Sequence, residues 1–447
     1  MSIRSSNVGY TSPSDFDVNI RTNTGFYPTA PLPRLPNGFA VWENALSTAK
    51  DKLVLGEDIP DNDHAQRATG ERWREQIRTL PVIRTDVLNT DKQLLRRAHK
   101  VLTFLVHFYA HSIPPNELSG PITIPRSLVS PLLQVSKELG MAPVVTFSDV
   151  VSWNWEYINP ELPFSAENVR FGVDLFGGSE DERNFFAGNG LVEIRGVEML
   201  QIFNDYQLIP DVSSPSSMGK VNRLLARLTT IIQEISEIIT SMRNTVDPQM
   251  FYWEVRPWLN GSGAGNRPEW IYEGVPDTSV LDLDGPSAGQ SGVMHAVDTF
   301  LDIDHKLKAR RQPAPSEENK RADRGFMERM RRYMPGRHRD YLSSLAANPR
   351  PVRELANNSP AIKDSYNGAV MALKKLRDAH VRIATLYVIS MARSNPPPGC
   401  PLYAMQQRME RERAQQRGPA TGTGGTQLSM LLKAGRDATH RAVLKND

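Results

Sequence analysis

His380 is the residue whose type and position point most directly to chemistry. It lies in the run Ser359–Ser394, where apolar residues recur at helical spacing. A histidine in an apolar helix stripe costs free energy unless its ring nitrogens find partners. One possible partner is a backbone carbonyl, which periodicity alone favours; another is haem iron, which a single helical histidine can hold. The stripe consists of Val370, Leu373, Leu376, His380, Ile383 or Ala384, and Tyr387.

Other constellations carry weaker signals. His107 and His111 lie four residues apart, a spacing that can grip a metal, but no acid lies between them and no third ligand is evident. The chain has no HExxH and no GxSxG pattern. Two glycine-rich runs, Gly261–Gly265 and Gly422–Thr426, do not follow a strand and open a helix with a lysine. Neither supports a phosphate loop.

An arginine surrounded by aromatic residues is more informative. The run Phe251–Asn260 reads FYWEVRPWLN and places Arg256 among them. Such an arginine either packs its stem on the rings or clamps a carboxylate, and packing alone is the more common outcome. The small residues of Gly285–Gly292, GPSAGQSG, either make a turn and a helix start or let the backbone approach a flat ligand.

Composition bounds the class of protein. The 447 residues are 39% hydrophobic and 23% charged, and 53 basic against 50 acidic residues give a net charge of +3. This balance argues against a nucleic-acid or membrane partner, and no apolar run reaches the length of a membrane helix. The N-terminus shows no signal-peptide pattern. With Cys400 as the single cysteine, we expect no intrachain disulfide and a reducing, cytoplasmic location.

Helical patterns dominate the chain and predict a mostly α protein. Strand signals are few: Pro121–Ile124 and a weaker one at Val144–Phe147. The clearest helical patterns cover Leu94–His111, Pro125–Leu139, Met218–Arg243, Gly292–Lys308, Glu317–Tyr333 and Ser359–Ser394.

We expect two domains. Residues 1–176 form a small N-terminal domain that begins with an irregular arm of about 40 residues rich in Pro, Asn, Ser and Thr. Residues 177–447 form a large helical domain, entered through the polar break Gly177–Arg183. Within it, 394–426 is Pro-rich at its start and Gly-rich at its end, then rejoins a helical pattern. That arrangement favours a mobile loop that closes over a site, with a passive linker as the alternative.

An ordered series of motifs resembles the indoleamine 2,3-dioxygenase family. The resemblance runs from about Pro143 to the C-terminus and is weaker before it. It implies an all-helical, two-domain fold whose large domain carries haem b. Family members use haem iron and O2 to open the pyrrole ring of L-tryptophan to N-formylkynurenine, in the kynurenine pathway of tryptophan catabolism. The motifs are Asn154-Trp155, Phe185-Phe186, LVEI at Leu191–Ile194, Phe251 with Arg256, Tyr272–Gly274, GPSAGQSG, MRRYMP at Met330–Pro335 with His338-Arg339, LRDAHVRIATLY and GTGGTQL.

The resemblance assigns the cofactor residues. It makes His380 the proximal ligand of the haem iron and the only metal ligand. Arg377 would pair with a haem propionate, Asp298 would lie near that arginine, and Ser287 would lie beside the haem edge. No residue is implied as a catalytic acid or base.

The resemblance also assigns the substrate residues. Phe251 would stack on the indole and Arg256 would hold the carboxylate of the amino acid. We expect a monomer that binds L-tryptophan and O2. The remaining pocket residues implied are Phe147, Val150, Val151, Phe185, Asn189, Ser287, Ala288 and the loop residue Thr423.

Asn189 departs from the family pattern, because the mammalian enzyme has a serine there. An amide is larger than a hydroxyl and carries two donors, so it could bond O2 or crowd the indole. Two alternatives therefore stay open beside tryptophan dioxygenation. One is a haem protein on the same scaffold that binds O2 with little turnover; the other is a dioxygenase acting on a modified indole.

Overall fold

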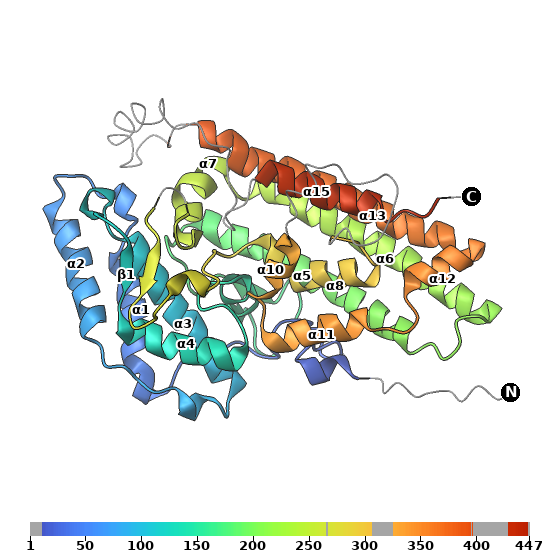
Figure 1. Cartoon of the computed structure of the whole chain (residues 1–447), viewed down its shortest axis with the longest axis horizontal. Helices are drawn as coiled ribbons and strands as arrows, with labels where there is room; N and C mark the ends of the chain where they lie inside the picture. The colour runs from blue at the N-terminus through green and yellow to red at the C-terminus, as the bar shows by residue number, and fades with distance from the viewer. Residues whose placement is uncertain (1–10, 265–266, 306–324, 395, 397–427, 446–447) are drawn as a thin grey trace.

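The chain folds into a mostly helical molecule, as the sequence predicts. The computed structural model describes residues 11–264, 267–305, 325–394, 396 and 428–445. Figure 1 shows the long helices α6, α13 and α15 running side by side, with α1 to α4 gathered at the other end of the molecule. The α-helices are α1 Ala40–Lys52, α2 His64–Thr79, α3 Lys92–His111, α4 Arg126–Leu139, α5 Glu180–Gln207, α6 Pro215–Ser241, α7 Pro248–Met250, α8 Gly292–Phe300, α10 Phe326–Arg331, α11 Gly336–Ala346, α12 Val352–Asn358, α13 Pro360–Ala384 and α15 Leu428–His440.

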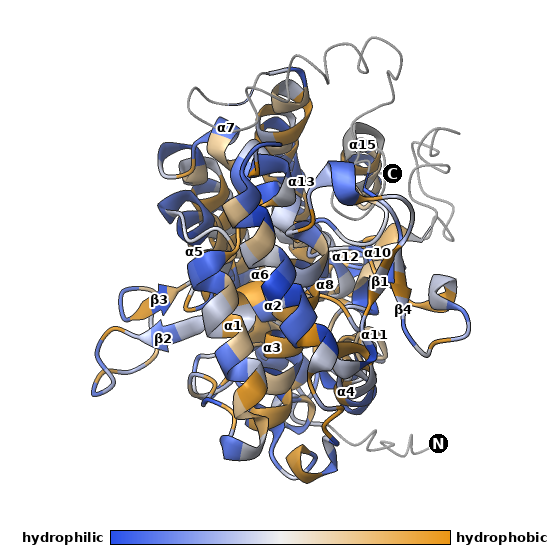
Figure 2. Cartoon of the chain, turned by 90° about the vertical axis from the view of Figure 1, so that its left-hand side faces the viewer, coloured by the Kyte–Doolittle hydropathy of each residue, from blue (hydrophilic) through white to orange (hydrophobic). Residues whose placement is uncertain are grey.

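Extended structure is limited to two small ribbons in the described residues. β1 (Ile122–Ile124) pairs in parallel with β4 (Trp270–Tyr272), and β2 (Trp155–Tyr157) pairs antiparallel with β3 (Val169–Phe171). Figure 2 shows the two ribbons on opposite sides of the helical body. The strand predicted at Pro121–Ile124 is therefore confirmed as β1.

The strand predicted at Val144–Phe147 is wrong. Val144 and Val145 are fully buried, but they lie in a loop that leads into a π-helical turn at Ser148–Ser152. Asp149 takes the place of a strand partner: its Oδ2 accepts from the Thr146 backbone N–H at 2.9 Å and from the Thr146 hydroxyl at 2.7 Å. The apolar run reflects burial, and a buried loop has the same composition as a buried strand.

The helix that carries His380 is held by α6. The apolar stripe of α6 packs along α13, where Tyr366, Val370 and Leu373 are fully buried. Each fully buried aliphatic side chain contributes roughly 1.5–3 kcal/mol relative to an exposed one, so this seam fixes α13 firmly. On α6 the buried members are Val221, Leu225, Leu228, Ile231, Ile232 and Ile235.

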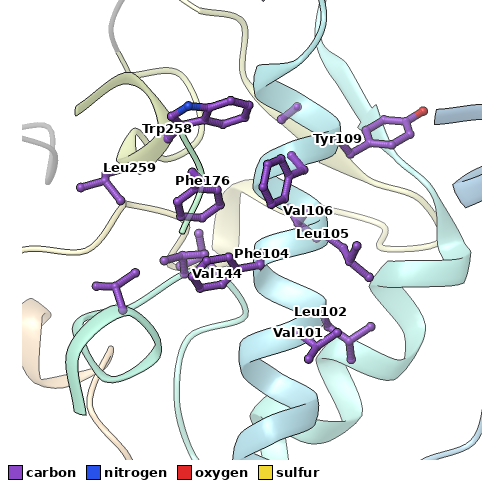
Figure 3. Close-up of a cluster of buried hydrophobic side chains, with 14 of the residues drawn as sticks. Val101, Leu102, Phe104, Leu105, Val106, Tyr109, Val144, Phe176, Trp258 and Leu259 are labelled. Carbon is purple, nitrogen blue, oxygen red and sulfur yellow. The ribbon is translucent and has the colours of Figure 1, made fainter. Parts of the chain in front are cut away.

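An aromatic core lies around α3, and both the N-terminal and later parts of the chain contribute to it. Figure 3 shows a row of apolar side chains on α3, with the rings of Phe176 and Trp258 beside the helix. The Phe176 ring stacks on Phe104 with centroids 4.3 Å apart and on Trp258 with centroids 5.7 Å apart. Trp258 follows Arg256 in the chain, so this core anchors one wall of the functional site described below.

The long helix α5 was not predicted as a helix. Its glycines lower helix propensity and blur the apolar stripe. Gly190 is needed for close packing, because a Cβ there would lie 2.3 Å from the Phe171 ring. The carbonyl oxygen of Gly190 also accepts a hydrogen bond from the Tyr27 hydroxyl, at 3.0 Å. The tertiary contact therefore explains a glycine that the sequence pattern counts against the helix.

The arm packs against the large helices instead of standing alone. Its described part, residues 11–39, contains only short 3₁₀ turns at Pro13–Phe16 and Asn37–Phe39. Phe26 is buried beside the start of α8, where a Cβ on Gly292 would lie 2.5 Å from its ring. Gly292 of the GPSAGQSG run therefore serves packing against Phe26.

Two predicted helices end differently from expectation. α8 ends at Phe300 instead of continuing to 308, because the chain turns at Asp302 with φ of +51°. The helix predicted at Glu317–Tyr333 is described only from 325 onward, where α10 covers Phe326–Arg331. The predicted loop at 394–426, with Thr423 and Cys400, lies outside the described residues apart from Ser394 and Pro396. Among the described helices, none combines the length and the apolarity that a membrane crossing requires.

Candidate functional site

Most of the predicted site residues line one cavity. The cavity measures about 320 Å³, within the range of about 300–1,000 Å³ typical of small-molecule sites. Asp298 does not line it, and Thr423 lies outside the described residues. The predicted residues that line it are Phe147, Val150, Val151, Phe185, Asn189, Phe251, Arg256, Ser287, Ala288, Arg377 and His380.

Three π-helical turns surround this cavity. Ser148–Ser152 supplies Val150 and Val151, Phe251–Val255 supplies Phe251, and Thr385–Ser390 continues α13 and supplies Tyr387. A π turn widens a helix locally and is common at functional sites. Three of them from distant parts of the chain meeting at one cavity mark it as the candidate site.

His380 faces the cavity with an unsatisfied ring. It is half-buried on α13, and its ring nitrogens have no hydrogen-bond partner within the described part of the chain. Burial lowers the pKa of His380, and the nearby Arg377 guanidinium lowers it further, which keeps the imidazole neutral. A neutral imidazole with a free lone pair in an apolar cavity is what axial ligation of haem iron requires. The residues present therefore fit the haem that the family uses.

No competing metal site is found among the described residues. No group of three or more His, Cys, Asp or Glu side chains there could hold an ion. His107 and His111 are buried, and each uses one ring nitrogen on a backbone carbonyl at 2.8 Å, that of Trp258 and that of Asn260. The contacts assign both histidines to the packing of α3.

An ion pair joins α13 to α8. Arg377 donates from Nη2 to both oxygens of Asp298, at 2.7 Å and 2.6 Å, and from Nη1 to the Thr439 hydroxyl on α15. Burial acts to raise the pKa of Asp298, but Arg377 and His305 together hold it well below its usual range. Asp298 therefore stays ionised and shares the charge of Arg377.

His305 is a site residue that the sequence did not reveal. Its Nε2 lies 2.7 Å from Asp298 Oδ2, and its ring lines the cavity beside Arg377. It also lines a larger, more polar cavity of about 490 Å³ together with Asp298.

Arg256 lines the same cavity from the 3₁₀ turn Arg256–Leu259. Its guanidinium carbon lies 5.4 Å from the centroid of the Tyr252 ring, and the side chain lines the cavity, so the contact with an aromatic ring is found while the carboxylate clamp stays a prediction. Burial lowers the pKa of Arg256 while Tyr252 acts to raise it, and the group remains a cation at neutral pH. A half-buried cation in an apolar wall is suited to an anionic partner.

Two phenylalanines form the aromatic wall beside Arg256. The rings of Phe185 on α5 and Phe251 have centroids 4.5 Å apart at 46°, and Phe251 meets Tyr387 edge-on at 5.6 Å. The Tyr387 hydroxyl donates to the Val246 carbonyl at 2.5 Å, which turns its polar end away from the cavity. The wall is therefore apolar and suited to a flat ring.

The wall formed by Phe147, Val150 and Val151 is held by a buried polar pair. Asp149 accepts from His99 Nδ1 at 2.8 Å, and both side chains are fully buried. Gln290 links this wall to the GPSAGQSG loop, because its Oε1 accepts from the Phe147 backbone N–H at 2.8 Å. The short 3₁₀ turn Ala288–Gln290 begins at Ser287, whose oxygen accepts from the Gly289 N–H at 3.2 Å.

Glu193 is a second residue that sequence reasoning quoted without a role. It is buried on α5 and accepts from the Ser291 hydroxyl at the start of α8, and from the Val293 N–H at 3.4 Å. Burial raises the pKa of Glu193 to about 7, against the lowering effect of these hydrogen bonds. The sequence pattern alone does not distinguish this buried acid on a helix from a surface acid.

The fold and the cavity define a mostly helical protein with an apolar small-molecule site. Residues 12–442 match the family model described as indoleamine 2,3-dioxygenase, and the chain belongs to that family. It is 28% identical to "Indoleamine 2,3-dioxygenase 1" of Rattus norvegicus, over 96% of this chain and 95% of the relative. It is 28% identical to "6-hydroxytryptophan 2,3-dioxygenase" of Fusarium equiseti, over 94% and 95%. It is also 27% identical to a protein named "Myoglobin" from Haliotis madaka, over 81% and 86%.

Proposed function

We propose that this chain is a haem-dependent dioxygenase that opens the indole ring of L-tryptophan with O2 to give N-formylkynurenine. The observation that carries the proposal is the common cavity of His380, Arg256 and the Phe185–Phe251 wall. These groups match the three requirements of the reaction: an iron ligand, an anion-binding cation and an apolar slot for a flat ring.

In this proposal His380 on α13 would hold the iron of haem b. When bound, the haem iron supplies the activation of O2 for insertion of both oxygen atoms into the indole. Asp298 and Thr439 hold the side chain of Arg377, which would pair with a haem propionate, and Ser287 would lie beside the haem edge. Because burial and Arg377 lower the pKa of His380, its imidazole stays neutral and keeps a nitrogen lone pair for the iron.

Other residues of the cavity would position the substrate. Arg256 binds the substrate carboxylate, with an attraction strengthened by the apolar surroundings. Phe251 and Phe185 fix the plane of the indole, and Phe147, Val150 and Val151 exclude water. No side chain acts as a catalytic acid or base, so the protein contributes orientation and a dry pocket.

Two specific observations favour a second candidate substrate and a second candidate activity. Asn189 replaces the family serine, and one relative is named a 6-hydroxytryptophan 2,3-dioxygenase, so a ring-modified tryptophan is the second candidate substrate. Another relative is named a myoglobin instead of a dioxygenase, so a haem protein with little turnover is the second candidate activity. The presence of Arg256 and the aromatic wall favours the enzyme, because O2 binding alone needs neither.

The test is an absorption spectrum of the purified protein, reduced under O2, with and without L-tryptophan. We expect a Soret band of one haem per chain and growth of the N-formylkynurenine absorbance only when tryptophan is present. Haem without product from L-tryptophan or a ring-hydroxylated tryptophan supports the oxygen-binding candidate. Absence of haem after reconstitution overturns the proposal.

Some expectations from the sequence stay predictions. These are the division into domains at residue 176, a cytoplasmic location, a monomeric state and the absence of nucleic-acid and membrane partners. The near-neutral net charge of +3 supports only the last of these, the absence of nucleic-acid and membrane partners.

A further inference from the structure

The amide of Asn189 has a fixed orientation. Asn189 lies one turn after Phe185 on α5, and its Nδ2 donates to the Phe185 carbonyl at 2.8 Å. A backbone carbonyl can only accept a hydrogen bond, so the nitrogen end of the amide must face it. The oxygen Oδ1 therefore points away from that carbonyl. It has no partner within the described part of the chain, and the side chain lines the cavity.

Oδ1 is set in an apolar environment. Phe185 and Phe251 form the neighbouring wall, and Val192 continues the same helix face. An acceptor in such a wall costs free energy whenever the bound ligand leaves it without a donor. A ligand that donates a hydrogen bond to Oδ1 therefore avoids this free-energy cost, and a ligand without a donor incurs it.

The other polar groups of the cavity already have roles. His380 and Arg256 are assigned above to the haem iron and to the substrate carboxylate. The hydroxyl of Tyr387 donates to Val246 and that of Ser291 to Glu193, while Arg377 and His305 both bind Asp298. Asn189 is the polar side chain left to contact the ring of the substrate on the Phe185 side.

We propose that Asn189 Oδ1 accepts a hydrogen bond from a donor on the indole ring, which makes Asn189 a specificity-determining residue. The inference rests on the proposed function and names its substrate class: indoles that carry a ring donor. Two donors have the required chemistry, the pyrrole N–H of an unsubstituted indole and the hydroxyl of a ring-hydroxylated one. A ligand that lacks the donor leaves Oδ1 unpaired and should bind roughly 10- to 100-fold more weakly.

The test compares three ligands with the haem-loaded parent and its variants. The ligands are L-tryptophan, L-tryptophan methylated on the indole nitrogen, and a ring-hydroxylated L-tryptophan. Dissociation constants come from the Soret shift on ligand binding, and kcat/KM values come from product formation. Asn189→Leu keeps the side-chain size and removes the polar atoms; Asn189→Ala is the second variant if the first lowers haem content.

Asn184→Leu is the matched control. Asn184 lies on the same helix outside the cavity, and its Nδ2 donates to the Thr245 carbonyl at 3.0 Å. Asn184→Leu removes an amide from the same helix without changing the cavity lining. It should therefore leave the preference among the three ligands unchanged.

We expect the parent to prefer one donor-bearing ligand by roughly tenfold or more, and Asn189→Leu to erase that preference. Loss of discrimination against the N-methylated ligand identifies the pyrrole N–H as the donor. Loss of the preference for the hydroxylated ligand identifies the hydroxyl. A parent that binds no indole overturns the proposed function together with this inference. A parent that binds and converts indoles, with the same ligand preference in Asn189→Leu, overturns the inference alone.

Discussion

Arg377 and Asp298 form a buried two-oxygen ion pair that ties the haem helix α13 to α8. The Nη2 atom of Arg377 lies 2.7 Å and 2.6 Å from the two carboxylate oxygens, and only 4% of the Asp298 side chain is exposed. Arg377 precedes His380 by one helical turn. The position of the proposed iron ligand therefore depends on a contact with an element about 80 residues away in the chain.

Asp298→Asn should destabilise the folded chain strongly. The substitution leaves a buried arginine without its counter-charge, which costs about 3–5 kcal/mol. Urea unfolding at pH 7 measures the loss. The control is Asp378→Asn, which breaks the half-exposed pair with Lys374 on the same helix and should cost under about 1 kcal/mol. Equal costs for the two variants would contradict the importance of the pair.

The same variant should change the dependence of stability on pH. The folded-state pKa of Asp298 is held below its ordinary value of 3.8, so its contribution is present above that pH and is lost as the pH falls through the folded-state pKa. The difference in stability between parent and Asp298→Asn should therefore shrink in acid. A difference that stays constant from pH 7 to pH 3 would show that the ion pair is not its source.

His380→Ala should abolish haem retention, because it removes the imidazole that α13 presents to the cavity. The ratio of Soret absorbance to protein absorbance measures haem content, with added imidazole as a rescue. The exposed His440 on α15 gives the matched control, His440→Ala, which should keep one haem per chain. An unchanged haem spectrum in His380→Ala would reject this ligand.

Arg256→Leu should raise KM for L-tryptophan far more than it lowers haem content. Truncation of a buried charge-assisted pair costs roughly 2–5 kcal/mol, or about 30-fold to several thousand-fold in affinity. Tryptamine, which lacks the carboxylate, supplies the control: the parent should turn it over poorly, and Arg256→Leu should narrow the gap between the two substrates. Efficient use of tryptamine by the parent would rule out the carboxylate clamp.

Glu193→Gln should stabilise the protein at alkaline pH. Burial raises the folded-state pKa of this carboxyl from 4.5 to about 7, so the folded state binds a proton that the unfolded state releases. The parent therefore loses stability as the pH rises between these two values, by about 3 kcal/mol. Glutamine can still accept from Ser291 and carries no charge, so the variant should lack this decline. Parallel stability curves from pH 5 to pH 8 would contradict the assignment.

Short-range pattern was enough to predict the mostly helical fold and the stripe on which His380 lies. Helical periodicity depends only on residues three and four apart, so α3, α4, α6 and α13 could be read from the chain. The family resemblance supplied the candidate site residues, and those within the described residues were brought to one cavity, with Asp298 the exception.

Longer-range relationships needed the tertiary structure. Gly190 weakens the helical pattern of α5, yet the approach of Phe171 requires it. The buried run Val144–Phe147 has the composition of a strand, but it bonds to Asp149 in a loop. In both cases burial by distant parts of the chain decides the outcome, and local propensity is overridden.

The chemistry of the site was also settled by contacts between distant elements. The sequence shows that Asn189 is an amide, but only the bond to the Phe185 carbonyl decides that its oxygen is left to face a ligand. Likewise, His305 and Thr439 join Arg377 and Asp298 through side chains from three separate segments. Residue types are fixed by the sequence, whereas hydrogen-bond partners, burial and the resulting pKa shifts exist only once the chain has packed.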